Sequence, residues 1–550
     1  MNEAHEDSAG PDRGGLAALP IGTLRDVAGA SSRILLSTPA LHALGDEEDV
    51  AVRLSGQVGN MVKMRAGDLW VMANVRGLRS DPEGLMADVD FIGEGEVGAD
   101  GRLADFRQGV TLFPLPGAEA YPVTSADLGT VFAADARAHV EIGTVYPTSD
   151  IRAALYVDPL LGKHFAVLGS TGTGKSTAVA LILHRIAAVA PKGHIVMIDP
   201  HGEYGAAFKD GAALFSADNL ALPYWLMNLD EHAEVLLTSE GADRRRDTDI
   251  LAKALLTARR KSGHGAASAS GSAAGTVTVD TPVPYLLSDL HQILTDEMGR
   301  LDRGNEPGPY QRIIKKLDEV RTDPRYQFMF AGMLVQDRMA DVMTTLFRLP
   351  AEGKPLSIID VSGVPSDVVR TVVSTLGRLA LDYAVWAREG DRHPILFICE
   401  EAHRYVPRDD AAEGGQAVRR VLERIAKEGR KYGVSLGLVT QRPSDLASGV
   451  LSQCGTILSM RLNNHRDQEV VAAAIPEGAQ GFIDAIPALR NREAIVSGEG
   501  VSLPLRLRFD TLEEECRPAS DDPAFADLWN REGDERAIVE RTIARWRGTA

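Results

Sequence analysis

Eight consecutive residues have the types and spacing of a phosphate-binding loop. The segment 169–176 reads GSTGTGKS and fits the pattern G-x-x-x-x-G-K-[ST] in full, between an apolar run and a predicted helix. Its glycines let backbone N–H groups surround phosphate oxygens, Lys175 supplies charge for the β- and γ-phosphates, and Ser176 offers a hydroxyl to Mg²⁺. The pattern therefore predicts a site for ATP and Mg²⁺ rather than a glycine loop that binds nothing. The predicted nucleotide ligands are Gly169, Ser170, Thr171, Gly172, Thr173, Gly174, Lys175, Ser176 and Thr177.

A pair of acidic residues follows a second apolar run. Ile395–Cys399 is typical of a buried strand, and Glu400 and Glu401 come directly after it. Ligands bind at the carboxyl ends of strands in open α/β sheets, so we predict that Glu400 binds Mg²⁺ and that Glu401 polarises the attacking water. Successive strand residues face opposite sides, so both acids can serve one nucleotide only if the strand ends there. The alternative is a solvated acid pair at a strand end.

Two further residues complete the predicted catalytic set of Lys175, Glu401, Gln441 and Arg430. Gln441 follows an apolar run, where an amide could detect the γ-phosphate or orient water; the alternative is a strand-end cap. Arg430 follows a glycine at a predicted helix end. A guanidinium on a loop there could reach the nucleotide of another subunit as an arginine finger. Arg461 and Arg466 are the alternatives for that role.

The segment IDPHGEY, residues 198–204, ends another predicted strand and has two interpretations. Glu203 could position water or relay the nucleotide state to a neighbouring subunit. Alternatively, the segment is a turn capped by Asp199. Both interpretations stay open at this point. His201 and His403 lack the spacing of zinc ligands, so no zinc site is expected.

The elements around these motifs alternate between apolar strands and a helix with apolar residues at helical spacing, which predicts a parallel sheet covered by helices. The helix is expected over residues 177–190. The strands are expected over 164–168, 194–200, 356–360, 395–399, 435–440 and 456–460.

The chain is expected to divide into four regions. Residues 1–18 are predicted to form a disordered tail, 19–150 a β-barrel, 151–500 an ATPase core, and 501–550 an extension that packs on the core or on a neighbour. A helical insertion is expected within the core over about 230–347, interrupted by the small-residue segment SGHGAASASGSAAG. Short strands separated by turn residues carry the barrel prediction. They are Arg33–Ser37, Val50–Val58, Leu69–Val75 and Val110–Phe113. The extension contains the strand-like LPLRLRF and a closing helix over 535–547.

Composition limits how such a chain can contact nucleic acid. Acidic residues outnumber basic ones by 77 to 59, the net charge is −18, and the three cysteines suggest neither a disulfide framework nor a zinc site. No apolar run is long enough to span a bilayer, and the first residues do not resemble a signal peptide, so we expect a cytoplasmic protein without membrane attachment. Nucleic acid must then be held by local basic clusters on loops, although a solvated helix face is the alternative. The candidates are Arg244, Arg245, Arg246, Arg259, Arg260 and Lys261.

Taken together, these motifs resemble the HerA family of hexameric DNA translocases, in the HerA–FtsK branch of P-loop ATPases. The acid pair written Glu-Glu-Ala-His is itself a form found in that family. The segments that carry the resemblance are HFAVLGSTGTGKS (164–176), IDPHGEY (198–204), VDTPVPYLLSDL (279–290), IIDVSGVP (358–365), FICEEAH (397–403), RIAKEGRKYGVSLGLVTQRPSDL (424–446) and LNNHRDQEVV (462–471).

The resemblance implies a RecA-like core capped by a HAS-barrel and assembled as a homohexamer. It implies ATP hydrolysis at subunit interfaces that drives double-stranded DNA through a central channel. It also implies a nuclease or other effector docked on the barrel, in DNA end processing, repair or antiviral defence. Two other classes stay open. One is a transfer ATPase of the conjugation type, for which membrane attachment would be expected, and the other is a non-translocating ring that regulates an associated enzyme.

Overall fold

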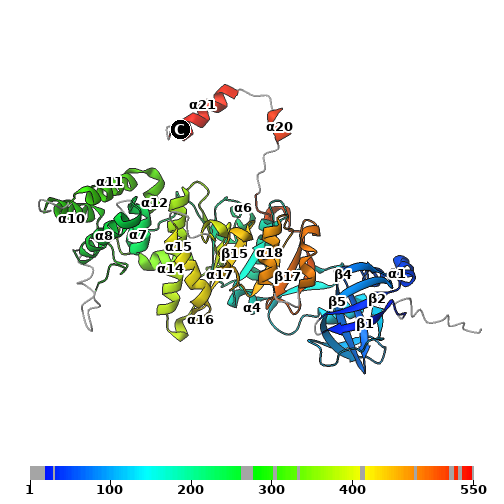
Figure 1. Cartoon of the computed structure of the whole chain (residues 1–550). Helices are drawn as coiled ribbons and strands as arrows, with labels where there is room; N and C mark the ends of the chain where they lie inside the picture. The colour runs from blue at the N-terminus through cyan, green and yellow to red at the C-terminus, as the bar shows by residue number, and fades with distance from the viewer. Residues whose placement is uncertain are drawn as a thin grey trace, which may run out of the picture.

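The computed structural model has a barrel at one end, a large mixed sheet in the middle and a helical unit at the other end (Figure 1). The predicted tail over 1–18 and the small-residue segment lie outside the described residues. The structure describes residues 19–28, 31–261, 277–300, 306–330, 335–408, 415–475, 480–519, 525–530 and 535–547.

The N-terminal region is a closed antiparallel barrel, as predicted. Within the described residues its strand order is β2-β1-β7-β3-β4-β5, and pairing of β2 with β5 closes the ring, while β6 extends the sheet beyond β5. Closure leaves no open edge among the six barrel strands, so in the described part of this region β6 alone has an unpaired edge. The strands are β1 (Gly22–Ala28), β2 (Ser31–Leu36), β3 (Met61–Ala66), β4 (Leu69–Asp81), β5 (Gly84–Val97), β6 (Leu103–Gln108) and β7 (Glu119–Pro122).

Two of the predicted barrel strands are wrong. Val50–Arg53 is the short helix α2, because Asp49 accepts a hydrogen bond from the Ala51 amide at 2.9 Å and caps it. Residues 110–113 form a loop, in which Glu94 accepts a hydrogen bond from the Thr111 amide at 2.8 Å. In both places a carboxylate oxygen accepts a hydrogen bond from a backbone amide, which is then not available for pairing with a neighbouring strand.

The central sheet has the order β12-β13-β11-β14-β15-β10-β16-β17-β18-β8-β9 among the described residues. The strands from β12 to β16 in this order are parallel, and the remaining ones pair antiparallel. The six predicted core strands are therefore confirmed. The strands are β8 (His139–Val145), β9 (Arg152–Tyr156), β10 (Phe165–Leu168), β11 (Ile195–Asp199), β12 (Ala212–Phe215), β13 (Leu356–Asp360), β14 (Ile395–Cys399), β15 (Val434–Thr440), β16 (Thr456–Ser459), β17 (Glu493–Gly498) and β18 (Leu505–Phe509).

The strand order has a direct consequence for the site. β10, β15, β14 and β11 are consecutive neighbours, so their carboxyl ends meet along one stretch of the sheet edge. Each of these strands is followed by one of the predicted motifs. Segments far apart in the sequence therefore reach the same edge, where ligands bind in open α/β sheets.

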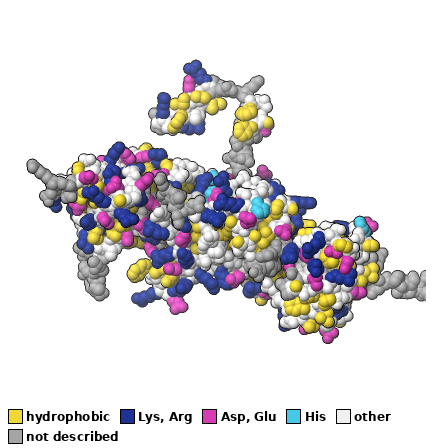
Figure 2. All heavy atoms as spheres, viewed as in Figure 1, with side chains coloured by type: hydrophobic (Ala, Val, Ile, Leu, Met, Phe, Trp, Pro, Cys, Tyr) yellow, Lys and Arg dark blue, Asp and Glu magenta, His cyan; other side chains and the backbone are white. Residues whose placement is uncertain are grey.

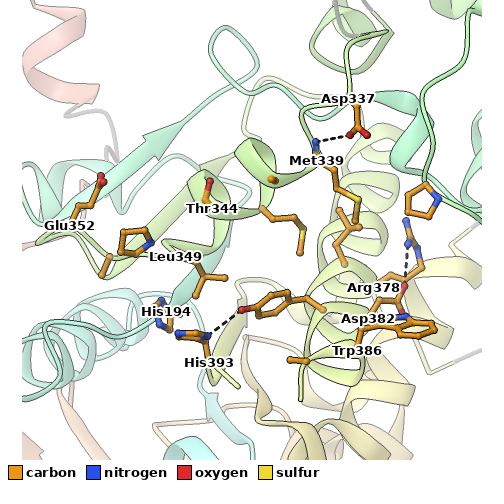
Figure 3. Close-up of a pocket in the computed structure, with 18 of the residues that line it drawn as sticks. His194, Asp337, Met339, Thr344, Leu349, Glu352, Arg378, Asp382, Trp386 and His393 are labelled. Carbon is orange, nitrogen blue, oxygen red and sulfur yellow. Dashed lines mark hydrogen bonds and ion pairs between the residues drawn. The ribbon is translucent and has the colours of Figure 1, made fainter. Parts of the chain in front are cut away.

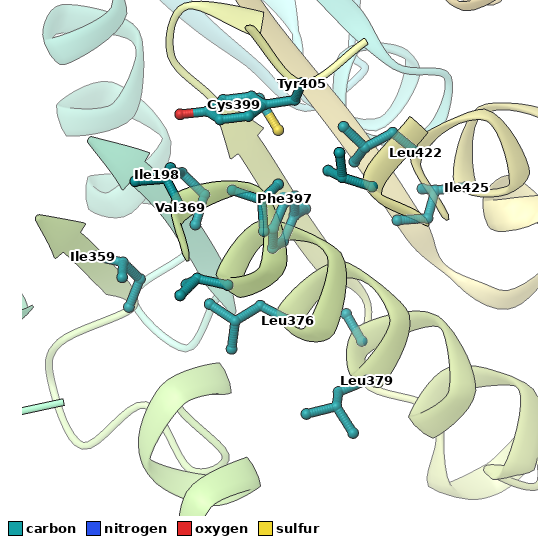
Figure 4. Packing of buried hydrophobic residues seen from close by; sticks show 14 of the residues in the cluster. Ile198, Ile359, Val369, Leu376, Leu379, Phe397, Cys399, Tyr405, Leu422 and Ile425 are labelled. Atoms are coloured by element: carbon teal, nitrogen blue, oxygen red, sulfur yellow. The ribbon is translucent and has the colours of Figure 1, made fainter. Parts of the chain in front are cut away.

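Helix α14 (Ser366–Trp386) covers the sheet beside the acid-bearing strand. Leu376 and Leu379 of this helix, with Phe397 of β14, belong to one buried apolar cluster, shown in Figure 4. Burying large apolar side chains of this kind contributes roughly 1.5–3 kcal/mol each. The packing holds β14 rigidly, and with it the residues at its carboxyl end.

The helical unit is an insertion between β12 and β13. A buried ion pair joins it to the core: Arg378 of α14 donates to Glu231 of α7 through Nε at 3.0 Å and Nη2 at 2.9 Å. Ser374 also donates to Glu231, at 2.9 Å. Within the described residues the insertion comprises α7 (Leu229–Leu236), α8 (Gly241–Lys261), α10 (Leu287–Gly299), α11 (Gly308–Thr322), α12 (Gln327–Phe330) and α13 (Met339–Phe347).

The C-terminal segments confirm the predicted strand as β18 and the predicted closing helix as α21 (Glu535–Trp546), which lies apart from the body with α20 (Phe525–Trp529). Trp529 and Trp546 are 81% and 88% exposed. In the part of the chain that the structure describes, no helix combines the length and apolarity required to cross a membrane.

The buried ion pair generates a first prediction. Replacing Glu231 by Ala leaves the buried Arg378 guanidinium with only the partly exposed Asp382 as a carboxylate partner, at 3.3 Å, which should destabilise the insertion and its attachment by about 3 kcal/mol. Chemical denaturation of the full chain, followed by circular dichroism, measures the loss.

Glu319→Ala in α11 is the matched control. Glu319 pairs with Lys316 at 3.8 Å, and its side chain is 52% exposed, so its loss should cost less than about 1 kcal/mol. Equal, small effects of the two variants would contradict the role given to the buried pair.

Candidate functional site

The phosphate-binding loop connects β10 to helix α5 (Lys175–Val189). Gly172 and Gly174 have φ values of 76° and 96°, a region that residues with a side chain rarely adopt. A Cβ added to Gly169 would lie 2.8 Å from the Cβ of Met460. The loop thus needs its glycines, and the amino end of α5, which carries positive partial charge, faces the same concave backbone.

Lys175 is buried at the start of α5, and its Nζ donates to the Ser170 carbonyl at 3.2 Å. Burial lowers the pKa of Lys175, whereas the charges of Glu400, Glu401 and Glu203 oppose that shift. The Lys175 ammonium therefore already lies at the loop, where it could donate to a phosphate oxygen instead of the Ser170 carbonyl. Together, the loop amides and this ammonium fit a nucleoside triphosphate.

The acid pair lies on one edge because β14 ends at Cys399. Glu400 is outside the strand, and Glu401 has the left-handed φ value of 52°, so the alternation of strand side chains does not extend to them. Both residues are buried, at 5% and 6% exposure. A non-glycine residue at positive φ costs of order 1 kcal/mol or more, a strain found mainly at functional sites. The condition set by the sequence, that the strand must end at this point, is met.

Glu400 lies between β14 and the turn after β11. Tyr204, itself fully buried, donates from its hydroxyl to Glu400 Oε2 at 2.9 Å. Burial raises the pKa of Glu400 to about 8, which the hydrogen bond from Tyr204 and the charge of Lys175 partly oppose. A buried carboxylate so close to a phosphate loop suits a divalent cation, and Ser176 with Glu400 would hold Mg²⁺ there.

Glu401 is linked to the phosphate-binding loop through Gln441. The Gln441 amide donates to Glu401 Oε1 at 3.0 Å, and Thr171 donates its hydroxyl hydrogen bond to the oxygen of the same amide. Glu401 Oε2 is buried and accepts no hydrogen bond among the described residues, although His403 Nδ1 lies 3.2 Å away. An unsatisfied buried carboxylate oxygen is the group expected of a base that accepts a proton from water.

The side chain of Asp199 caps the turn that follows β11. Asp199 accepts hydrogen bonds from the amides of His201 at 3.2 Å, Gly202 at 2.9 Å and Tyr204 at 2.9 Å. Of the two interpretations left open by the sequence, the turn is therefore present. Glu203 lies within electrostatic range of Lys175, and its relay role stays a prediction.

Arg430 is not on a loop, contrary to the sequence expectation. The helix continues through a π-helical turn, Ile425–Gly429, into α16 (Arg430–Tyr432). Gly429 is closely packed there, since a Cβ would come 2.4 Å from the Val434 carbonyl oxygen. The exposed Arg430 precedes β15 and so lies at the amino edge of the sheet, opposite its own phosphate loop. Arg430 therefore lies on the other edge of the sheet from the nucleotide site of its own chain, and its role as an arginine finger stays a prediction.

The alternative arginines lie near the loop of their own chain. The Arg461 carbonyl accepts a hydrogen bond from the Ser170 amide at 2.9 Å, and its side chain donates to Asn491 at 3.0 Å. Arg466 is exposed in the first turn of α18 (His465–Ala474). Neither position distinguishes a trans role, so the choice of finger stays a prediction.

The basic candidates for DNA contact all lie on α8 rather than on loops, at its two ends. Arg259 is fully buried and donates to the Met227 carbonyl at 2.7 Å, so its prediction as a DNA contact is wrong. Arg244 donates to the Ala233 carbonyl at 3.3 Å and caps α7. The exposed members are Arg245, Arg246, Arg260 and Lys261. On the face drawn in Figure 2, side chains of both charges are interspersed.

Two residues of the site were missed by sequence reasoning. Tyr204 contacts Glu400 only because β11 and β14 are neighbours. Arg492, with a φ of 67°, donates its amide to the Thr173 carbonyl at 3.1 Å and so supports the loop from a distant segment. Neither has a local sequence signal of its chemistry, although Tyr204 is part of the IDPHGEY motif.

A large cavity of about 1700 Å³ lies away from this site. His194 and His393 precede β11 and β14 and line it together with Trp386 of α14, as Figure 3 shows. These residues mark the amino edge of the sheet, opposite the phosphate loop. No residue of the phosphate loop or of the acid pair lines the cavity. The size of the cavity is therefore no reason to assign the nucleotide site to it.

Comparison with known proteins agrees with this geometry. Residues 140–380 match the family model described as the central domain of helicase HerA. The DNA double-strand break repair helicase HerA of Pyrococcus furiosus is 26% identical over 511 residues, covering 84% of this chain and 88% of the relative. The protein of the same name from Sulfolobus acidocaldarius is 25% identical over 444 residues, covering 79% and 80%. Among solved structures, VirB4 of Thermoanaerobacter pseudethanolicus aligns with a TM-score of 0.50 and 15% identity, over 70% of this chain and 99% of that one.

The parallel sheet, its glycine loop and the acids on the same edge define the chain as a P-loop ATPase with a RecA-like core and an N-terminal barrel. The match over 140–380 and the relatives agree with the resemblance expected from the motifs: this part of the chain is similar to the central domain of helicase HerA.

The environment of Glu400 generates a second prediction. Because its pKa is raised from 4.5 to about 8, the folded state binds more protons than the unfolded state between these values, and stability falls as pH rises through this window. Glu400→Gln removes the buried charge. In nucleotide-free, Mg²⁺-free protein it should raise the melting temperature by a few degrees at pH 8.5 and have little effect at pH 5.

The exposed Glu513→Gln serves as control and should shift neither value. A stabilisation by Glu400→Gln that is the same at both pH values would contradict the raised pKa of Glu400.

Proposed function

We propose that the chain is an ATP-driven translocase or helicase for double-stranded DNA, working as a homohexamer with a nuclease or other effector on the barrel. The names of the relatives support a role on DNA and in double-strand break repair. The architecture supports an ATP site at a subunit edge. Hydrolysis at that edge would move the duplex through the ring, and end processing, repair or defence would be the setting.

ATP would bind with its phosphates along 169–176. Lys175 would neutralise charge on the β- and γ-phosphates, while Ser176 and Glu400 would hold Mg²⁺. The bound cation would supply charge that stabilises the transferring phosphoryl group. Glu401 would accept the proton of the attacking water through its buried Oε2 atom, and Gln441 would hold that carboxylate in place.

The observation that carries this proposal is the bridge made by Gln441. Thr171 of the phosphate loop and Glu401 of the neighbouring acid pair bind opposite ends of one amide, which fixes the orientation of the amide. If the Thr171 hydroxyl turned to donate to a γ-phosphate, the Gln441 amide would lose one of its two partners. The orientation of the amide, and with it its hydrogen bond to Glu401, would then change. The tip of β15 thereby links the presence of ATP to the group that splits it.

Coupling to neighbours and to DNA rests on residues away from this edge. Arg430 would approach the γ-phosphate of an adjacent subunit from the amino edge of its own sheet. DNA would be held through its phosphates by exposed basic residues, with Arg245, Arg246, Arg260 and Lys261 as the remaining candidates. The negative net charge of −18 would oppose nonspecific coating by nucleic acid.

DNA-stimulated ATP hydrolysis is the direct test of the proposed function. Duplex DNA should raise the hydrolysis rate, and the stimulation should fall steeply between 50 and 200 mM salt, on the order of tenfold or more, as phosphate contacts are lost. Lys175→Ala should abolish nucleotide binding. Glu401→Gln should keep ATP bound but reduce turnover by roughly 10²-fold or more.

Glu428→Gln, at an exposed position of the π-helical turn, is the control for the acid substitution. Full turnover in Glu401→Gln would remove its assignment as base. An ATP hydrolysis rate that is the same with and without duplex DNA would favour the alternative, a ring that only regulates an associated enzyme.

Mixing two inactive variants tests the trans role of Arg430. An arginine finger contributes about 10³–10⁵ in rate, so Arg430→Ala and Lys175→Ala should each be inactive alone. In mixed rings some interfaces pair an intact Lys175 with an intact Arg430, and part of the activity should return. Lys431→Ala, a neighbouring exposed position, should remain active. Rings shown to contain both variants but without activity would exclude Arg430.

A further inference from the structure

Tyr204 has a contact that the proposed reaction does not yet use. Its ring is fully buried, and its hydroxyl donates to Glu400 Oε2 at 2.9 Å. The Ser176 hydroxyl is near enough to the same phenol to lower its pKa, against the larger effect of burial, which raises it. The Tyr204 phenol therefore lies beside both residues that would hold the cation and is hydrogen-bonded to one of them.

The position of Tyr204 is fixed by the turn before it. Asp199 accepts the Tyr204 amide at 2.9 Å, in addition to the Gly202 amide. Gly202 has a φ of 69°, and a Cβ there would lie 3.1 Å from a carboxylate oxygen of Asp360, at the end of the adjacent strand. The turn is therefore closely confined on the side of β13, and the phenol has little freedom to leave Glu400.

The contact also decides how the carboxylate can be oriented. The Glu400 amide donates to the Ile198 carbonyl at 3.3 Å, but among the described residues only Tyr204 donates to the Glu400 carboxylate, so the phenol fixes the rotation of this group by holding Oε2. Oε1 is then left for a cation. A carboxylate held in one orientation loses less conformational freedom when it binds an ion, and outer contacts of this kind typically contribute 10- to 100-fold to metal affinity.

We propose that Tyr204 is a positioning residue for the Mg²⁺ that accompanies ATP, acting by orienting Glu400 and Ser176 toward the metal. This inference rests on the proposed function, since it assumes that Mg·ATP binds at the loop. It gives the IDPHGEY segment a specific role: Asp199 builds the turn, and the turn directs the final tyrosine to the acid of the next strand.

Tyr204→Phe removes the hydroxyl and keeps the ring. Binding of a fluorescent ATP analogue to the full chain, titrated with Mg²⁺ and repeated in EDTA, separates metal from nucleotide. In EDTA the variant should match the wild type within about twofold. With Mg²⁺, the gain in nucleotide affinity should fall by about tenfold, and half-saturation of ATP hydrolysis should need about tenfold more Mg²⁺.

Tyr405→Phe is the matched control, because Tyr405 is also buried, lies four residues beyond Glu401 in sequence, and its hydroxyl has no hydrogen-bond partner in the described structure. That variant should keep the Mg²⁺ dependence of the wild type. The affinity ratio with and without Mg²⁺ stays informative even if Tyr204→Phe lowers stability, since a distorted loop weakens both values together.

The outcomes separate this inference from the function on which it rests. If wild-type protein shows no Mg·ATP binding, the proposed ATP site itself fails. If the wild type binds Mg·ATP and Tyr204→Phe has the same affinity ratio as the wild type, the positioning role is overturned and the ATP site stands. An equal loss with and without Mg²⁺ also overturns it, because the hydroxyl would then support only the fold.

Discussion

The end of strand β14 at Cys399 is the constraint on which the site depends. A strand that continued for two more residues would send Glu400 and Glu401 to opposite faces of the sheet. Because the chain leaves the strand and Glu401 adopts a left-handed conformation, both carboxylates stay at the edge. The apolar packing of α14 against β14 holds the end of the strand in place. The free energy of this packing offsets the conformational cost of the left-handed backbone at Glu401.

The strand order turns this edge into a connected set of groups. β10 brings the phosphate loop, β15 brings Gln441, β14 brings the acids and β11 brings the turn with Tyr204. Each pair of neighbouring strands contributes a hydrogen bond across its tips: Thr171 with Gln441, Gln441 with Glu401, and Tyr204 with Glu400. Thr171, Gln441 and Glu401 form one continuous series of hydrogen bonds from the phosphate loop to the acid pair, and Tyr204 with Glu400 forms a second contact beside it.

Sequence reasoning succeeded where a signal was contiguous. The phosphate loop and the six core strands were predicted because each is a short run with its own pattern, and the motifs also indicated the family. It failed where a side chain redirects the backbone, as Asp49 does at Val50–Arg53. It also failed where burial depends on tertiary packing, since nothing in the triplet around Arg259 distinguishes the buried arginine from its exposed neighbour. The contact of Tyr204 with Glu400 requires the strand order, which the sequence alone does not specify.

A structure of the full chain with a non-hydrolysable ATP analogue and Mg²⁺ tests the central claim most directly. The account predicts the triphosphate along 169–176, the metal between Ser176 and Glu400, and the terminal phosphate nearest Lys175 and Glu401. Nucleotide bound elsewhere, such as in the cavity beside His194 and His393, or acids turned away from an occupied loop, would contradict it.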